Sequence, residues 1–134
     1  MRSRTCLTLA DANTIVAAAK AHAAAKKWPV AIVVLDEAGV PLHIERMDGA
    51  PLKTVETATL KARTSFQLGR PSADMEEGVK NRISLLGLPD IALLQGALPI
   101  KVKGDCVGAV GVSGVMSYED EEVARAGIAA LGLE

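Results

Sequence analysis

The stretch VAIVVLDEAGVPLHIER, residues 30–46, decides the fold. It begins with an unbroken run of apolar, mostly β-branched side chains at residues 30–35, which is typical of a buried strand. Asp36 to Gly39 then predict a turn, and residues 40–46 alternate loosely between apolar and polar side chains. The stretch therefore predicts a β-hairpin with one buried strand and a partner strand beside it.

An alanine-rich helix is expected before this hairpin, over residues 8–27. Alanine has the highest helix propensity, and apolar side chains recur here at helical spacing. The Thr8 hydroxyl can cap the first free amides, while Asp11 suits the positive end of the helix dipole. Pro29 cannot continue a helix, so it sets the end.

After the hairpin, the pattern predicts further helices and strands. Pro51 suits a first helical position and Gly69 a helix end, which gives a helix over residues 51–69. Because few helices connect the strands, we expect an α/β chain of the α+β kind, with helices packed on a mainly antiparallel sheet. The other expected elements are a polar helix at 72–82, a connection at 85–90, strands at 91–95, 98–103 and 106–113, a capping signal at 117–120 and a closing helix at 123–133.

Composition limits the class of protein. At 134 residues, the chain is expected to be one domain spanning residues 1–134. Its 15 Lys and Arg against 16 Asp and Glu include no long basic run, so nucleic acid is not an expected partner. No apolar stretch reaches ~18 residues, so no membrane segment is expected. Cys6 and Cys106 fit no zinc or redox pattern, which favours free thiols in a cytoplasmic protein.

Several short motifs, in order and at matching spacing, resemble one family. The chain is similar to the GlcG/HbpS-like proteins, also called the haem-degrading domain family, which includes the C-terminal domain of PduO-type proteins. The motifs are VLDEAG at 34–39, RMDGA at 46–50, KARTSF at 61–66, LPI at 98–100, GAVGVSG at 108–114 and EDE at 119–121.

This resemblance implies a fold, a ligand and an assembly. The implied fold is profilin-like, a five-stranded antiparallel sheet flanked by helices. The implied assembly is a homo-oligomer in which dimers build a hexameric or octameric ring. Some members bind haem, and some are reported to degrade it or to bind iron or cobalamin, so haem is the expected cofactor and a small planar or carboxylate ligand the expected partner.

The RMDGA motif is the first candidate site. Arg46, Met47, Asp48, Gly49 and Ala50 lie where a strand is expected to end and a helix to begin. Free amides at a helix start suit a carboxylate or a haem propionate, and an arginine can bind the same group with two hydrogen bonds. The alternative is an ion pair of the arginine with the neighbouring aspartate or an acidic helix, which would only fix the turn.

The glycine-rich strand is the second candidate. Gly108, Gly111 and Gly114 recur every three residues, in neither a dinucleotide nor a P-loop pattern. Such glycines permit either close packing of the first or last helix or the floor of a flat ligand site. The sequence predicts a pocket between the RMDGA turn, the glycine-rich strand and the helix that carries KARTSF. Ser113 on the strand and Lys61 on the helix are expected to line it.

Two histidines and one loop complete the set. The resemblance implies that His22, on the first helix, is the axial haem ligand and so the metal-binding residue, although it also fits a surface histidine. His43, in the middle of a strand, is a weaker candidate for a ligand than His22. Gln95-Gly96 replaces the Gly-Gly pair usual in relatives, which predicts a stiffer loop and, if the loop lines the pocket, a different ligand.

Three functions follow from these residues. The first is a haem- or tetrapyrrole-binding module. The second is a small enzyme of organic-acid or aromatic catabolism that acts on a carboxylate in the same pocket. No acid–histidine spacing indicates a metal site and no base lies near Cys106 or Ser113 in sequence, so no catalytic residue is assigned. The third is an oligomer without a ligand.

Overall fold

The computed structural model describes residues 1–133. Within this range four strands form one antiparallel sheet in the order β2-β1-β4-β3. The strands are β1 (Ala31–Leu35), β2 (Pro41–Arg46), β3 (Ala97–Val102) and β4 (Asp105–Ser113). The helices are α1 (Leu9–Ala25), α2 (Thr54–Leu68), α3 (Ser72–Val79) and α4 (Ser117–Ala129), with a short 3-10 helix η1 (Ile83–Gly87).

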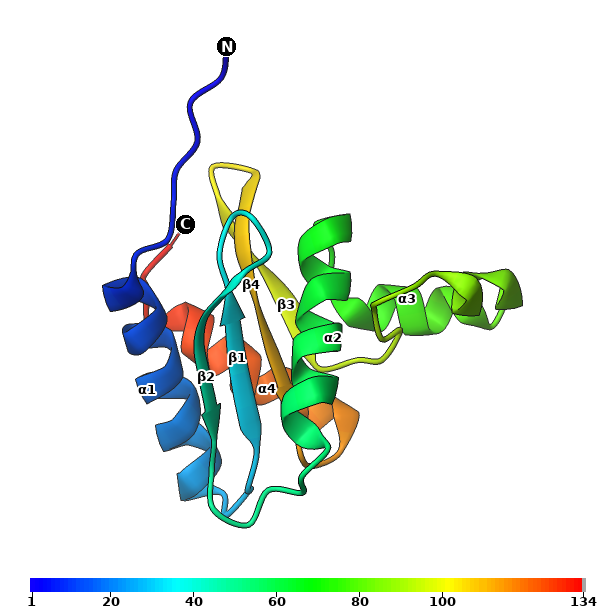
Figure 1. The fold of residues 1–134 in the computed structure, drawn as a ribbon. Coiled ribbons are helices and arrows are strands. Elements are labelled where there is room, and N and C mark those ends of the chain that lie inside the picture. Colours follow the sequence, from blue (N-terminus) through cyan, green and yellow to red (C-terminus); the bar gives the residue numbers. More distant parts are fainter. Residues whose placement is uncertain (134) are drawn as a thin grey trace.

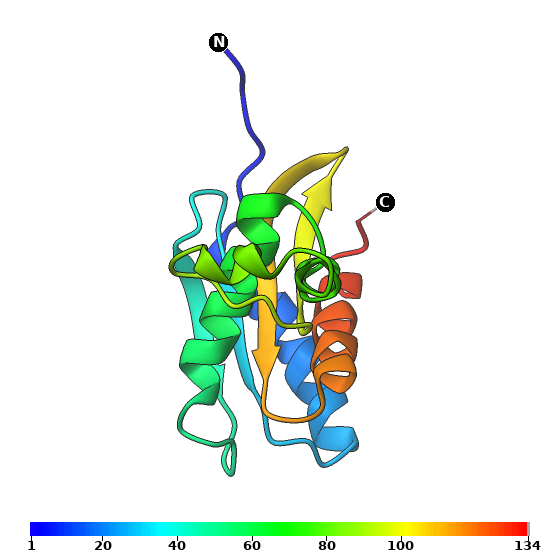
Figure 2. The ribbon, with the colours of Figure 1, turned by 90° about the vertical axis from the view of Figure 1, so that its right-hand side faces the viewer.

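The molecule has three layers, seen edge-on in Figure 2. α1 and α4 pack side by side on one face of the sheet, and α2 covers the other face (Figures 1 and 2). The β1 residues facing α1 and α4 include Ile32 and Val34, while Ala31 and Val33 face α2. Because both faces of β1 are covered, the whole strand is buried, as its unbroken apolar run predicts.

The predicted start of the first helix is confirmed. The Asp11 amide donates to Thr8 Oγ1 at 3.1 Å, and the Thr8 amide donates to Asp11 Oδ2 at 2.8 Å. This reciprocal pair satisfies two of the free amides at the helix start. Gly69 likewise closes α2 in the left-handed conformation, with φ 64°.

The start of α2 differs from the prediction. The helix begins at Thr54 rather than Pro51, because the Pro51 carbonyl first accepts hydrogen bonds from the amide and hydroxyl of Thr54. The RMDGA turn is therefore separated from the helix start by a further turn. At the other end of the chain, α4 begins at Ser117, earlier than predicted, and the Met116 amide donates to Glu119 Oε1 at 3.1 Å.

The predicted five-stranded sheet is wrong, since the described residues form four strands. The expected strand at residues 91–95 is an irregular segment. Its backbone bonds to α2 and to a side chain instead of a neighbouring strand: the Ala92 amide donates to the Leu60 carbonyl, and the Ala92 carbonyl accepts from Thr64 Oγ1. The Gln95 amide donates to Glu76 Oε2.

The polar helix is also shorter than predicted. α3 ends at Val79, and η1 overlaps the first part of the stretch at 85–90 that was expected as a plain connection. Together α3 and η1 form an arm that projects sideways from α2, shown in Figure 1. Four large apolar side chains on or just after this arm are exposed, namely Ile83, Leu86, Leu88 and Leu94.

Candidate functional site

The sheet register brings the two candidate motifs to the same end of the molecule. Ala31, the first residue of β1, pairs with Arg46 at the end of β2 and with Ser113 at the end of β4. The chain before β1 fills the space between the two motifs. A Cβ on Gly114 would lie 2.4 Å from the Pro29 carbonyl oxygen, and a Cβ on Gly49 would lie 3.5 Å from the Pro29 Cβ.

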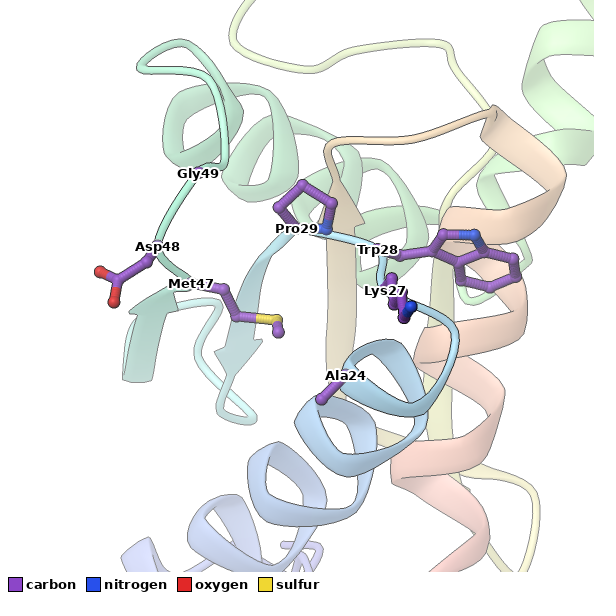
Figure 3. A pocket seen from close by; sticks show the side chains of 7 residues that line it. All are labelled: Ala24, Lys27, Trp28, Pro29, Met47, Asp48 and Gly49. Carbon is purple, nitrogen blue, oxygen red and sulfur yellow. The ribbon is translucent and has the colours of Figure 1, made fainter.

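A pocket of about 340 Å³ lies between the end of α1 and the RMDGA turn (Figure 3). The Met47 amide donates to the Val30 carbonyl at 2.9 Å, which holds the turn against the chain entering β1. In Figure 3 the Met47 side chain reaches towards Ala24, whereas the Asp48 carboxylate points away. The lining residues are Ala24, Lys27, Trp28, Pro29, Met47, Asp48 and Gly49.

The pocket matches the predicted one on one side only. Met47, Asp48 and Gly49 line it, as the sequence led us to expect, and Arg46 and Ala50 flank them. The opposite wall comes from the end of α1 and not from the KARTSF helix. Among residues 1–133, Arg46 makes no ion pair with Asp48 or with any other acid.

The glycines of β4 serve close packing. A Cβ on Gly111 would lie 2.1 Å from the Ala58 carbonyl oxygen and 2.9 Å from the Ala62 Cβ, so α2 rests directly on the strand. A Cβ on Gly108 would lie 2.3 Å from the Leu35 carbonyl oxygen of the adjacent strand. The helix that packs on Gly111 is α2, whereas the sequence suggested that the glycines admit the first or last helix. β4 is therefore covered at Gly111, and Ser113 is buried at its end.

Lys61 lies on α2 in a buried ion pair. Its ammonium donates to Asp120 Oδ2 at 2.9 Å and to the Val112 carbonyl at 3.1 Å, with 3% of the residue exposed. Burial raises the pKa of Asp120, and the Lys61 charge opposes that rise. Gly96 makes room for this pair, since a Cβ there would lie 2.7 Å from the Lys61 ammonium. Lys61 is outside the lining of the Met47 pocket.

His22 joins α1 to α4 next to the pocket. Its Nε2 lies 2.7 Å from Glu122 Oε2, which also accepts from the Lys26 ammonium at 3.1 Å. The hydrogen bond from His22, followed by that from Lys26, lowers the pKa of Glu122. The His22 ring centroid is 6.3 Å from that of Trp28, and the Lys26 ammonium lies 5.0 Å from the Trp28 ring centroid. His22 itself does not line the pocket, but it contacts a residue that does.

His43 is directed towards α1. Its Nδ1 lies 2.9 Å from Asn13 Oδ1 and its Nε2 lies 3.3 Å from Glu45 Oε1. The hydrogen bond from Lys20, and more weakly that from His43, lowers the pKa of Glu45. In the described part of the chain, no three His, Cys, Asp or Glu side chains gather as a metal site.

Sequence reasoning missed the α1 side of the pocket. The local pattern of the residues on this side predicts only a helix end, and they are Ala24, Lys27, Trp28 and Pro29. The chain has a single tryptophan, and its placement beside a proline was the available signal. None of the helices in residues 1–133 is long and apolar enough to cross a membrane.

These features define a small α+β protein with a shallow, partly apolar pocket at one end of an antiparallel sheet. The chain belongs to the HbpS-like family: the sequence model described as haem degrading protein HbpS-like matches residues 7–129. The resemblance found in the sequence is therefore confirmed.

Known relatives match in sequence and in structure. The chain is 35% identical to Protein GlcG of Escherichia coli over 114 residues, 84% of this chain and 85% of that protein. A double mutant of Streptomyces reticuli HbpS is 32% identical with a TM-score of 0.93, over 98% of this chain and 91% of that one. The complex of PduOC with haem has a TM-score of 0.89 at 22% identity, covering 97% and 98% of the two chains, which shows the shared fold.

Proposed function

We propose that this protein binds haem or a related tetrapyrrole in the pocket lined by Met47 and Trp28. The observation that carries the proposal is the lining itself, in a member of a family described as haem degrading. The lining brings the Met47 thioether, the apolar side chains of Ala24 and Pro29 and the Lys27 ammonium together, while the Trp28 indole points away from Met47 in Figure 3. Support also comes from PduOC, which has the same fold and whose solved complex contains haem.

The lining residues fit the chemistry of the group. Ala24 and Pro29 offer apolar contacts for the macrocycle, and the Lys27 ammonium suits a propionate. Methionine sulfur is an axial ligand of haem iron in other proteins, so Met47 is the ligand that this geometry favours. His22 is the alternative, and it would first have to release Glu122, which lies 2.7 Å from its Nε2. Bound haem would supply an iron centre for ligand binding or redox chemistry.

The open side of the pocket suggests that a second copy covers the ligand. Ligand pockets usually hold about 300–1,000 Å³, so a pocket of about 340 Å³ is small for a ligand as large as a tetrapyrrole. Exposed apolar side chains commonly mark protein interfaces. We therefore propose a dimer-based homo-oligomer that uses some of the exposed apolar side chains Val40, Ile44, Leu52, Ile83, Leu86, Leu88 and Leu94.

A hemin titration tests the binding proposal. Trp28 is the only tryptophan, so bound haem is expected to quench the intrinsic fluorescence while a Soret band grows to a fixed stoichiometry. Met47→Ala is expected to shift the Soret maximum or weaken binding, and His22→Ala tests the alternative ligand. Met75→Ala, on α3 away from the pocket, is the matched control and should titrate like the wild type. No saturable Soret change in the wild type would overturn the proposal.

Light scattering tests the assembly proposal. A mass of several chains at micromolar concentration is expected, because the four exposed apolar side chains on and after the arm are costly to leave in water. Ile83→Lys and Leu86→Lys are expected to reduce that mass if the arm forms the interface. A wild-type monomer at the same concentration would contradict an oligomer.

A further inference from the structure

α1 ends in a geometry that normally calls for glycine, yet a lysine occupies it. The Lys27 amide donates to the Ala24 carbonyl at 3.0 Å and the Trp28 amide donates to the Ala23 carbonyl at 2.9 Å. Lys27 is left-handed, with φ 60°. Glycine is the usual residue at this position because a Cβ makes the left-handed conformation unfavourable. Strained residues of this kind cluster at functional sites.

The two consecutive lysines have different surroundings. The Lys26 ammonium pairs with Glu122 at 3.1 Å and lies over the Trp28 ring. Lys27 lines the pocket, and within residues 1–133 its ammonium makes no ion pair or hydrogen bond. Asp48, the acid in the lining, points its carboxylate away from the pocket in Figure 3 and leaves Lys27 unpaired.

We propose that Lys27 is the residue of this pocket that recognises a carboxylate of the ligand. The inference rests on the proposed function, and it assigns the propionate contact to Lys27 rather than to Arg46. Lys26 already supplies a cation at the negative end of the α1 dipole, so the dipole alone does not call for a second lysine. Lys27 is therefore a cation of the lining that no acid within residues 1–133 neutralises, which is what a ligand carboxylate requires.

A pair of ligands isolates this contact. Hemin carries two free propionates, and its dimethyl ester has the same macrocycle and iron without their charge. Both are titrated in the same mixed solvent into the wild type and into the Lys27→Gly variant, with Trp28 fluorescence and the Soret band as readouts. Lys103→Gly is the matched control, because Lys103 is also left-handed, with φ 51°, but lies in the β3–β4 turn.

The wild type is expected to bind hemin about three- to tenfold more tightly than the ester, as a partly exposed charge-assisted hydrogen bond would give. Lys27→Gly is expected to bind the two equally, and Lys103→Gly to behave like the wild type. Both glycine variants are expected to raise the thermal midpoint by about 2–4 °C through relief of left-handed strain, which shows that weaker binding does not come from a damaged fold.

The outcomes separate the inference from the function on which it rests. A wild type that binds hemin and ester equally, or a Lys27→Gly variant that keeps the preference for hemin, would overturn the role of Lys27 while leaving haem binding in place. A wild type that binds neither ligand would overturn the haem proposal and this inference with it.

Discussion

Lys61 on α2 and Asp120 on α4 form a buried ion pair, with 2.9 Å between the ammonium nitrogen and Oδ2. The two helices cover opposite faces of the sheet, so the pair links the outer layers past the end of β4. The Lys61 ammonium also donates to the Val112 carbonyl, and Asp120 Oδ1 accepts from the Val115 amide at 3.1 Å. These four groups fix where β4 ends and α4 begins, which is the end of the sheet that carries the pocket.

Removing one charge of this pair should destabilise the fold strongly. Lys61→Met leaves Asp120 buried without its partner, which typically costs about 3–5 kcal/mol. The free energy of unfolding from urea titration measures the loss. Lys53→Met, which removes an exposed pair with Glu56, should change it by less than about 1 kcal/mol. Equal effects of the two variants would contradict the structural role given to Lys61.

A methyl group at Gly111 should separate α2 from the sheet. The added Cβ would lie 2.1 Å from the Ala58 carbonyl oxygen, a backbone atom that can move only with its helix. Overpacking of this kind typically costs about 1–3 kcal/mol or more, so Gly111→Ala should unfold at a clearly lower urea concentration. Gly87→Ala, where nothing lies within 4 Å of the added Cβ, should stay within about 0.5 kcal/mol of the wild type.

The contact between His22 and Glu122 should make stability depend on pH in the acid range. Hydrogen bonds from His22 and Lys26 lower the pKa of Glu122 below its ordinary value of 4.5. The carboxylate therefore binds fewer protons in the folded chain, and its stabilisation is present above pH 4.5 and lost as the pH falls through the lowered value. Glu122→Gln should lower the thermal midpoint at pH 6 by about 1 °C, and the difference should vanish in acid.

Trp28 fluorescence gives a second readout of the same contact. His22 and Lys26 both lie against the indole, so Glu122→Gln should change the emission at pH 6. Glu121→Gln removes an acid that, within residues 1–133, pairs with Arg125 alone, and it should leave the emission unchanged. A pH profile of stability that is the same in wild type and Glu122→Gln would refute the coupling.

The loop at Gln95-Gly96 is expected to influence stability more than binding. The Gln95 amide is held by Glu76, and neither loop residue lines the Met47 pocket. Gln95→Gly restores the glycine pair usual in relatives and should cost about 0.5–1 kcal/mol through the added freedom of the unfolded chain. Hemin affinity should be unchanged. A changed affinity would show that this loop reaches the ligand, as the sequence suggested.

Local patterns predicted most of the elements because their signals act within a few residues. The capping pair of Thr8 and Asp11, the glycine at the end of α2 and the β-branched run of β1 each specify a conformation without help from distant chain. The strand prediction at residues 91–95 is wrong because an apolar stretch becomes a strand only when another strand forms hydrogen bonds with its backbone. Here the backbone of Ala92 is hydrogen-bonded to residues of α2 instead.

The sequence by itself determined the family, the helices, the four strands that exist and the turn that carries Met47. Only the tertiary structure decided that this turn faces the end of α1, and that Lys61 and Gly111 serve packing between layers. The physical reason is register: pairing of Ala31 with Arg46 and Ser113 sets which ends of distant segments meet. Such pairing depends on contacts between residues that are tens of positions apart, and local propensities carry no information about those contacts.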